Sequence, residues 1–159
     1  MVNHAMIIDV EASGLGDNSY PIEIAWVNRL NRHQNDSFLV CPDPSWTFWD
    51  DYAEQSIHRI PRDSLLKDGV SVINACNRLN DALKGHRILS DAAQTDRFWI
   101  RKLFSCAGIQ SEFSIGSIYE LIPGDKADVF QRRLKKESVP HRALEDARAI
   151  AKCVNFVCS

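Results

Sequence analysis

Three groups of ionisable side chains have types and spacings that could carry out chemistry. The first is the pair Asp9 and Glu11, two positions apart at the end of an apolar run. Residues two apart in a strand point to the same face, about 6.6 Å apart along the backbone, so both carboxylates converge on one point. Clustered carboxylates repel each other unless a cation compensates them, and Mg²⁺ binds one or two carboxylates together with water and phosphate oxygens. A solvated acidic pair at a loop edge is the alternative.

The second group is His141 and Asp146, with the histidine at or just before the start of an expected helix and the aspartate about one turn inside it. An imidazole titrates near neutrality and can remove a proton from water, while Asp146 could complete a metal site with Asp9 and Glu11. Asp96 is the third candidate, because it follows a short strand and falls in the first turn of another expected helix. Helix N-termini favour carboxylates on electrostatic grounds alone, so both helical aspartates have a structural alternative.

These side chains need a scaffold that brings the ends of several elements together. Residues 5–10 form a nearly continuous apolar run, typical of a central strand buried on both faces. Residues 21–27 and 36–41 also have strand patterns, and the short links between these three segments predict an antiparallel meander. Two further strands are expected at residues 87–90 and 112–122.

From about residue 50 the apolar period changes from that of strands to that of helices. Residues 72–83 have apolar side chains at helical spacing, and Gly85 ends the segment. Further helices are expected at residues 95–107, 125–138 and 143–157. A meander followed by alternating strands and helices predicts an α/β fold, a mixed five-stranded sheet flanked by helices, in a single domain over residues 1–159.

The composition limits the classes of protein to consider. The chain has 159 residues, of which 45% are hydrophobic and 25% charged, as in an ordinary folded domain. A formal charge of −2 argues against wholesale coating of a nucleic-acid backbone but allows local basic patches. No apolar run reaches the roughly 18 residues of a membrane span, so we expect no membrane association and a cytoplasmic location. Five cysteines without a CxxC pair predict free thiols.

Three segments, in chain order, resemble the motifs of the DEDD superfamily of 3′-to-5′ exonucleases, in the histidine subclass that includes oligoribonuclease, ribonuclease T and polymerase proofreading subunits. Residues 7–15 resemble the first motif, residues 88–103 the second and residues 141–147 the third. The resemblance therefore extends over nearly the whole chain. It implies a ribonuclease H-like fold and a hydrolase that removes nucleotides from 3′ ends with two divalent ions, Mg²⁺ or Mn²⁺.

The same resemblance assigns a role to each candidate. Asp9, Glu11 and Asp146 would hold one ion, and Asp9 would be shared with the second. Asp96 would hold the hydration shell of that second ion. His141 would be the general base that deprotonates water.

The departures from the family pattern are at positions that would contact the substrate. Ala12 stands where the family has Thr or Ser, so only its backbone could contact a nucleotide. Asp91 and Ala92 stand in place of His-Asn, and Thr95 in place of Phe. Leu15 could wedge against the terminal base, as the resemblance implies, or it could cap the core.

Basic and aromatic side chains give further candidates for substrate binding. Two basic groups would guide a single strand by its phosphates if they faced the site, or would be solvated helix faces: Arg97, Arg101 and Lys102, and Arg132, Arg133, Lys135 and Lys136. Three aromatic residues could stack on bases or form a homodimer contact: Trp46, Phe48 and Trp49. His58 echoes a family segment, but we expect it to be structural.

The sequence favours a metal-dependent exonuclease that acts on 3′ ends of single-stranded RNA or DNA, or on short oligonucleotides, and releases nucleoside 5′-monophosphates. The alternative is a nucleic-acid-binding or assembly module of the same fold with little or no turnover, motivated by Ala12, Ala92 and Thr95. The complete set of carboxylates and the histidine argues against this alternative, because clustered carboxylates are costly and a decayed site would lose them first.

Overall fold

A computed structural model describes residues 4–137 and 140–159 of the chain. Its centre is one five-stranded sheet with the order β3-β2-β1-β4-β5. The strands are β1 (Met6–Ala12), β2 (Pro21–Asn28), β3 (Asn31–Leu39), β4 (Arg87–Ser90) and β5 (Ser114–Ser117). β1 pairs antiparallel with β2 and parallel with β4, so the sheet is mixed, as the sequence predicts.

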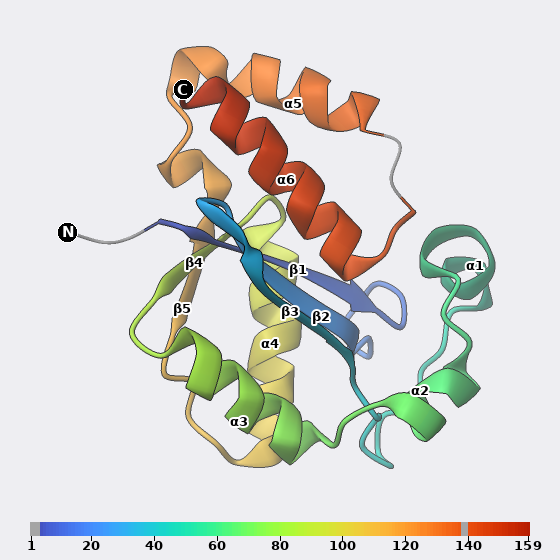
Figure 1. Cartoon of the computed structure of the whole chain (residues 1–159). Helices are drawn as coiled ribbons and strands as arrows, with labels where there is room; N and C mark the ends of the chain where they lie inside the picture. The colour runs from blue at the N-terminus through green and yellow to red at the C-terminus, as the bar shows by residue number, and fades with distance from the viewer. Residues whose placement is uncertain (1–3, 138–139) are drawn as a thin grey trace.

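Helices cover both faces of this sheet (Figure 1). Two of them, α3 (Val72–Leu83) and α4 (Ala93–Ala107), pack on one face, while α5 (Ala127–Lys136) and α6 (Ala143–Val157) pack on the other. Short elements lead from β3 to α3: α1 (Asp51–Ala53), the π-helical turn η1 (Glu54–His58) and α2 (Arg62–Asp68). Two 3₁₀ turns lead from β5 to α5: η2 (Ile118–Glu120) and η3 (Gly124–Lys126).

The central strand β1 is buried on both faces. Its side chains alternate between the two faces of the sheet, and this alternation decides where its carboxylates point. Met6, Ile8 and Val10 join the core on the side of α3 and α4, whereas Ile7 joins the core on the side of α6. Full burial of a side chain such as Ile8 contributes about 1.5–3 kcal/mol, and a one-residue slip would reverse every face. The register therefore holds residues 9 and 11 on the side of α6.

Several boundaries differ from those expected. The third strand starts at Asn31 rather than at residue 36, because an exposed edge strand carries polar residues that give no apolar signal. The last strand stops at Ser117, whose side chain and that of Glu120 form a capping box for η2. The helix expected at 125–138 spans Ala127–Lys136, and position 138 lies outside the described residues.

Two predictions from composition are also addressed by the structure. The five cysteines are free, as expected. None of the helices in the described part of the chain is long and apolar enough to cross a membrane.

Candidate active site

The candidate residues meet where β1 and β4 end. These strands are neighbours and run parallel, so their carboxyl ends lie at the same edge of the sheet. Ligands of open α/β sheets commonly bind at this edge. A pocket of about 540 Å³ opens there between the strand ends, α4, α5 and the start of α6. Its ionisable lining residues are Asp9, Glu11, Asp91, Asp96, Lys135, Glu137, His141 and Asp146.

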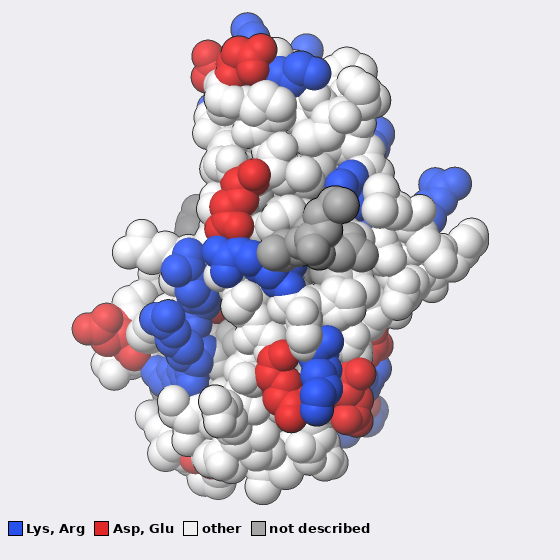
Figure 2. Space-filling view, turned by 90° about the vertical axis from the view of Figure 1, so that its left-hand side faces the viewer, with Lys and Arg blue, Asp and Glu red and all other residues white. Residues whose placement is uncertain are grey.

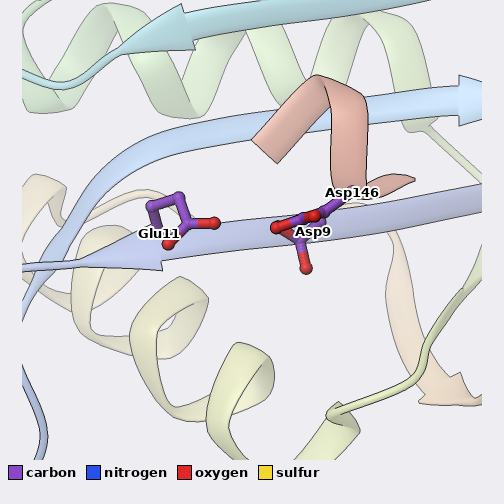
Figure 3. Close-up of side chains that lie close together, drawn as sticks. All are labelled: Asp9, Glu11 and Asp146. Atoms are coloured by element: carbon purple, nitrogen blue, oxygen red, sulfur yellow. The ribbon is translucent and has the colours of Figure 1, made fainter. Parts of the chain in front are cut away.

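Three of these carboxylates form a compact cluster. Asp9, Glu11 and Asp146 each place one oxygen within 4.8 Å of the others (Figure 3). Burial, followed by repulsion from Asp146, raises the pKa of Glu11 to about 9. Burial is also the main reason that the pKa of Asp146 rises to about 6. The folded chain therefore brings negative charges together at an energetic cost that a bound cation would offset.

Asp9 lies near the end of β1 and has one fully buried carboxylate oxygen. Burial, then the charges of Asp96 and Glu11, raise its pKa well above the ordinary value. Its Oδ2 atom is shielded from solvent and has no hydrogen-bond donor among the described residues. A buried acceptor without a donor is costly, whereas carboxylate oxygens are preferred ligands of Mg²⁺. This unpartnered oxygen fits a divalent cation between the three carboxylates.

Asp96 lies beside the cluster rather than inside it. The residue is 2% exposed, and the Ser90 hydroxyl donates a hydrogen bond of 2.6 Å to its Oδ2 atom. Burial raises its pKa to about 8, although the hydrogen bond from Ser90 acts in the opposite direction. The sequence reasoning missed Ser90, which is the last residue of β4 and also accepts a hydrogen bond from the Ala92 amide.

His141 stands at the mouth of the pocket, just ahead of α6. Its Nδ1 atom lies 4.0 Å from Oδ2 of Asp146, and its side chain is 64% exposed, against 17% for that of the aspartate. An accessible imidazole beside a more buried carboxylate can accept a proton, and the carboxylate then stabilises the resulting cation.

A hydrogen-bonded ion pair between β2 and α6 fixes the start of α6. Glu23, which is 5% exposed and lies opposite Glu11 in the sheet, accepts hydrogen bonds from the Arg142 guanidinium and from the Ala143 amide. Arg142 is the N-cap residue of α6, and its own side chain caps no amide there. Glu23 therefore holds the segment that carries His141 and Asp146. A glutamate within the apolar run of residues 21–27 was a signal for this role that the sequence analysis did not use.

Solved structures share this fold. Exonuclease I of E. coli, in a complex with single-stranded DNA, superposes with a TM-score of 0.74 at 16% identity, covering 98% of this chain and 40% of that chain. Exonuclease I from Methylocaldum szegediense gives a TM-score of 0.69 at 16% identity, over 95% of this chain and 42% of that one. A 3′-exonuclease with 3′-end specific recognition of a histone mRNA stem-loop gives 0.69 at 14% identity, over 99% of this chain and 65% of that one.

These similarities confirm the ribonuclease H-like α/β fold. The chain spans about two fifths of the length of the Exonuclease I chains that it matches. Neither a protein-family model nor a curated protein sequence matches it.

The structure places the predicted substrate residues in different surroundings. Ala12 is buried at the end of β1. Leu15 is 77% exposed, so the alternative that it caps the core is wrong. The preceding Gly14 packs against Phe48, since a Cβ atom at Gly14 would lie 2.8 Å from the phenyl ring. The exposed side chain of Leu15 therefore follows a tightly packed turn.

The structure gives different surroundings to the members of the first basic group, which are Arg97, Arg101 and Lys102. Arg97 does not line the carboxylate pocket but a separate pocket, which it shares with Arg101. Lys102 donates hydrogen bonds to the carbonyl oxygens of Asp17 and Ser19, at 3.0 and 2.8 Å, and so holds the turn after β1. Sequence spacing alone could not separate these roles.

Trp46, a candidate for stacking on bases, and His58, expected to be structural, are both part of the interior. Trp46 is buried and stacks on Tyr20 with ring centroids 5.3 Å apart, so it is not available to a base. His58 is buried as well, and its Nδ1 atom accepts a 3.0 Å hydrogen bond from the Ile60 amide, as a structural histidine would. Trp49 donates its indole N–H to Glu54. Among the three aromatic residues, Phe48 keeps an exposed ring.

The pocket also contains residues that the site prediction omitted. Asp91 lines it beside the cluster, and burial raises the pKa of this carboxyl group. Lys135 from α5 and Glu137 line it as well. Lys135 is the one lining residue with a permanently cationic side chain among those described.

Proposed function

We propose that this chain is a metal-dependent exonuclease that hydrolyses phosphodiester bonds at the 3′ end of single-stranded nucleic acid and releases nucleoside 5′-monophosphates. The observation that carries the proposal is the compact cluster of Asp9, Glu11 and Asp146, with its unpartnered buried oxygen, next to the exposed imidazole of His141. The fold shared with exonucleases supports it, as does the order of the three motifs, which favours the histidine subclass.

Two divalent ions, Mg²⁺ or Mn²⁺, are the cofactors that this donor set fits. Asp9, Glu11 and Asp146 would hold one of them, and Asp9 would also face the second. Ions of this kind, when bound, lower the pKa of water and stabilise charge on phosphate and leaving oxygens. Asp96, hydrogen-bonded to Ser90 and set back from the cluster, suits an indirect contact through water.

The chain's own residues supply the remaining functions. His141 would take the proton of the attacking water on its imidazole, and Asp146, 4.0 Å away, would stabilise the imidazolium. Leu15 would contact the terminal base, and the backbone at Ala12 would contact the nucleotide. Lys135, which lines the same pocket, could pair with a substrate phosphate.

A cleavage assay tests the proposal directly. Single strands of RNA and DNA and dinucleotides, each labelled at the 5′ end, are incubated with the protein and Mn²⁺, with and without EDTA. We expect progressive shortening from the 3′ end in Mn²⁺ and none in EDTA, with the RNA and DNA arms identifying the preferred substrate. A circular single strand is the control, and its cleavage at the rate of the linear strand would contradict the exonuclease proposal.

The same assay identifies a binding module. Retention of the strand without any product, in Mg²⁺ and in Mn²⁺, would favour that alternative, for which the departures at Ala12, Ala92 and Thr95 are the motive. A cytoplasmic location and a homodimer remain predictions from the sequence.

A further inference from the structure

A second hollow lies on a different side of α4 from the carboxylate pocket. Its volume is about 550 Å³, and it is lined by Arg87, Arg97 and Arg101 over an apolar floor that includes Phe104 and Phe113. It opens beside the edge strand β5, on the face shown in Figure 2, where Lys and Arg side chains form a column. The aspartate and glutamate side chains of the described chain do not line it.

Two of the three arginines have no carboxylate partner in the part of the chain that the structure describes. Arg87 forms an ion pair with Glu120. Arg97 and Arg101 have no carboxylate partner within the described ranges 4–137 and 140–159. The Nε atom of Arg97 is also shielded from solvent without an acceptor among these residues. Because a guanidinium presents its N–H groups in a fixed fork that matches phosphate, the hollow is suited to an anion.

The position of this hollow connects it to the catalytic candidates. Asp96 lines the carboxylate pocket, and Arg97, the next residue of α4, lines the basic hollow. With 3.6 residues per turn, Arg101 stands about one turn further along α4, on the same side as Arg97. A strand that leaves the carboxylate pocket around the start of α4 would meet Arg97 first and Arg101 next.

We propose that this basic hollow binds phosphate groups of the substrate strand upstream of its 3′-terminal nucleotides. The proposal rests on the proposed function and specifies how a longer strand is held. The carboxylate pocket is lined by six acidic residues, so without its ions it repels a polyanion. Affinity for a strand must then come from cationic groups outside that pocket, and the apolar floor can contact sugars and bases.

A rival basic pocket lies between β2, β3 and α6 and is lined by Arg29, Arg32, Arg148 and Lys152. Lys152 pairs with Glu137, and Arg29 donates to the neutral His4 carbonyl oxygen and Asn155, whereas Arg32 and Arg148, like Arg97 and Arg101, have no carboxylate partner in the described part of the chain. The rival pocket also has no aromatic residue in its lining. We therefore use it as the control.

The experiment measures equilibrium binding of fluorescent single strands of two, six and twelve nucleotides by anisotropy, in EDTA and at several salt concentrations. The test variant is Arg97→Gln with Arg101→Gln, and the control is Arg32→Gln with Arg148→Gln, which removes the same charge. For wild type we expect affinity to rise with length. For the test variant we expect the twelve-nucleotide Kd to rise by about tenfold or more at low salt, and the slope of log affinity against log salt to fall by about 1.4.

The control variant is expected to keep the wild-type slope. An unchanged slope in the test variant, or an equal fall in the control, would overturn the proposal. Should the double variant melt below wild type, Arg101→Gln alone carries the test, because this residue is exposed, and its slope should fall by about 0.7. Binding in EDTA needs no turnover, so failure of the proposed activity and failure of this inference give separate results.

Discussion

Replacing Asp9 by Asn is expected to abolish turnover and to stabilise the metal-free protein. Asp9 belongs to the carboxylate cluster, and its buried Oδ2 atom has no hydrogen-bond donor in the described structure. An amide removes one negative charge at nearly constant shape, and its N–H groups can donate to the remaining carboxylates. A residue that only held the fold together would show the opposite change in stability.

The magnitude follows from the spacing of the cluster. Two full charges 4.8 Å apart interact by about 3.5 kcal/mol at an effective dielectric constant of 20. The wild-type protein avoids part of this cost by holding protons, so we expect a gain of about 1–3 kcal/mol at pH 8 in EDTA. For a chain of this size, that gain corresponds to an increase in Tm of about 3–10 °C.

The stability gained by Asp9→Asn in EDTA must also increase as pH rises. The pKa values of Glu11, about 9, and Asp96, about 8, lie above the ordinary values of 4.5 and 3.8. Between these limits the folded wild-type protein holds protons that the unfolded chain has released, so its metal-free stability falls as pH rises from about 4 to about 9. The variant has lost the central charge, so its profile is flatter and the two proteins converge at pH 5.

The assay is thermal unfolding of wild type and Asp9→Asn at pH 5 and pH 8, each in EDTA and in Mn²⁺. In wild type, Mn²⁺ at a hundred times its Kd should add about 2.7 kcal/mol, and the response of the variant should be much smaller. A variant that melts below wild type at pH 8 in EDTA would refute the reasoning from repulsion. An undiminished response to Mn²⁺ would remove Asp9 from the metal site.

Three further changes test the surroundings of the cluster. His141→Ala should lower turnover by 10²–10⁴-fold with Tm and Mn²⁺ affinity nearly unchanged, and the acidic limb of the rate against pH should be lost or displaced; near-native turnover with saturating metal would exclude a general base. Arg142→Gln should lower the free energy of unfolding, measured in urea, by about 1–2 kcal/mol. The buried Glu23 would keep its hydrogen bond from the Ala143 amide but lose a guanidinium whose side chain is 42% exposed. Unchanged stability would contradict a stabilising role for this pair. Leu15→Ala, at an exposed position, should change stability by less than about 0.5 kcal/mol and raise KM, and an unchanged KM would remove Leu15 from substrate binding.

The parts of the fold that sequence patterns predicted are those fixed by local rules. The apolar run of β1 indicated a buried central strand, and the two-residue period placed Asp9 and Glu11 on one face. The position of Asp146 one turn into α6 was equally local, because it depends on where a helix starts. Bringing that turn to the end of β1 was not local, and there the resemblance to known motifs supplied the information.

The features that the sequence did not predict depend on contacts between distant segments. Glu23 and Arg142 are 119 positions apart, and neither residue type indicates the other as its partner. The face of α4 that carries Arg97 could not be assigned to a pocket, because helical spacing fixes directions around the helix but not what lies opposite. The same limit applies to Trp46, whose burial depends on stacking with Tyr20.

Opposite charges on two sides of α4 connect metal binding with substrate binding. The carboxylate pocket is lined by six acidic residues together with Lys135 and His141, whereas the neighbouring hollow is lined by three arginines. Without cations, the first pocket repels the phosphates that the second attracts, so a strand held by Arg97 and Arg101 would meet repulsion at its 3′ end. Ions that neutralise the cluster remove this conflict, and by thermodynamic linkage the bound strand must raise the affinity for those ions by the same factor.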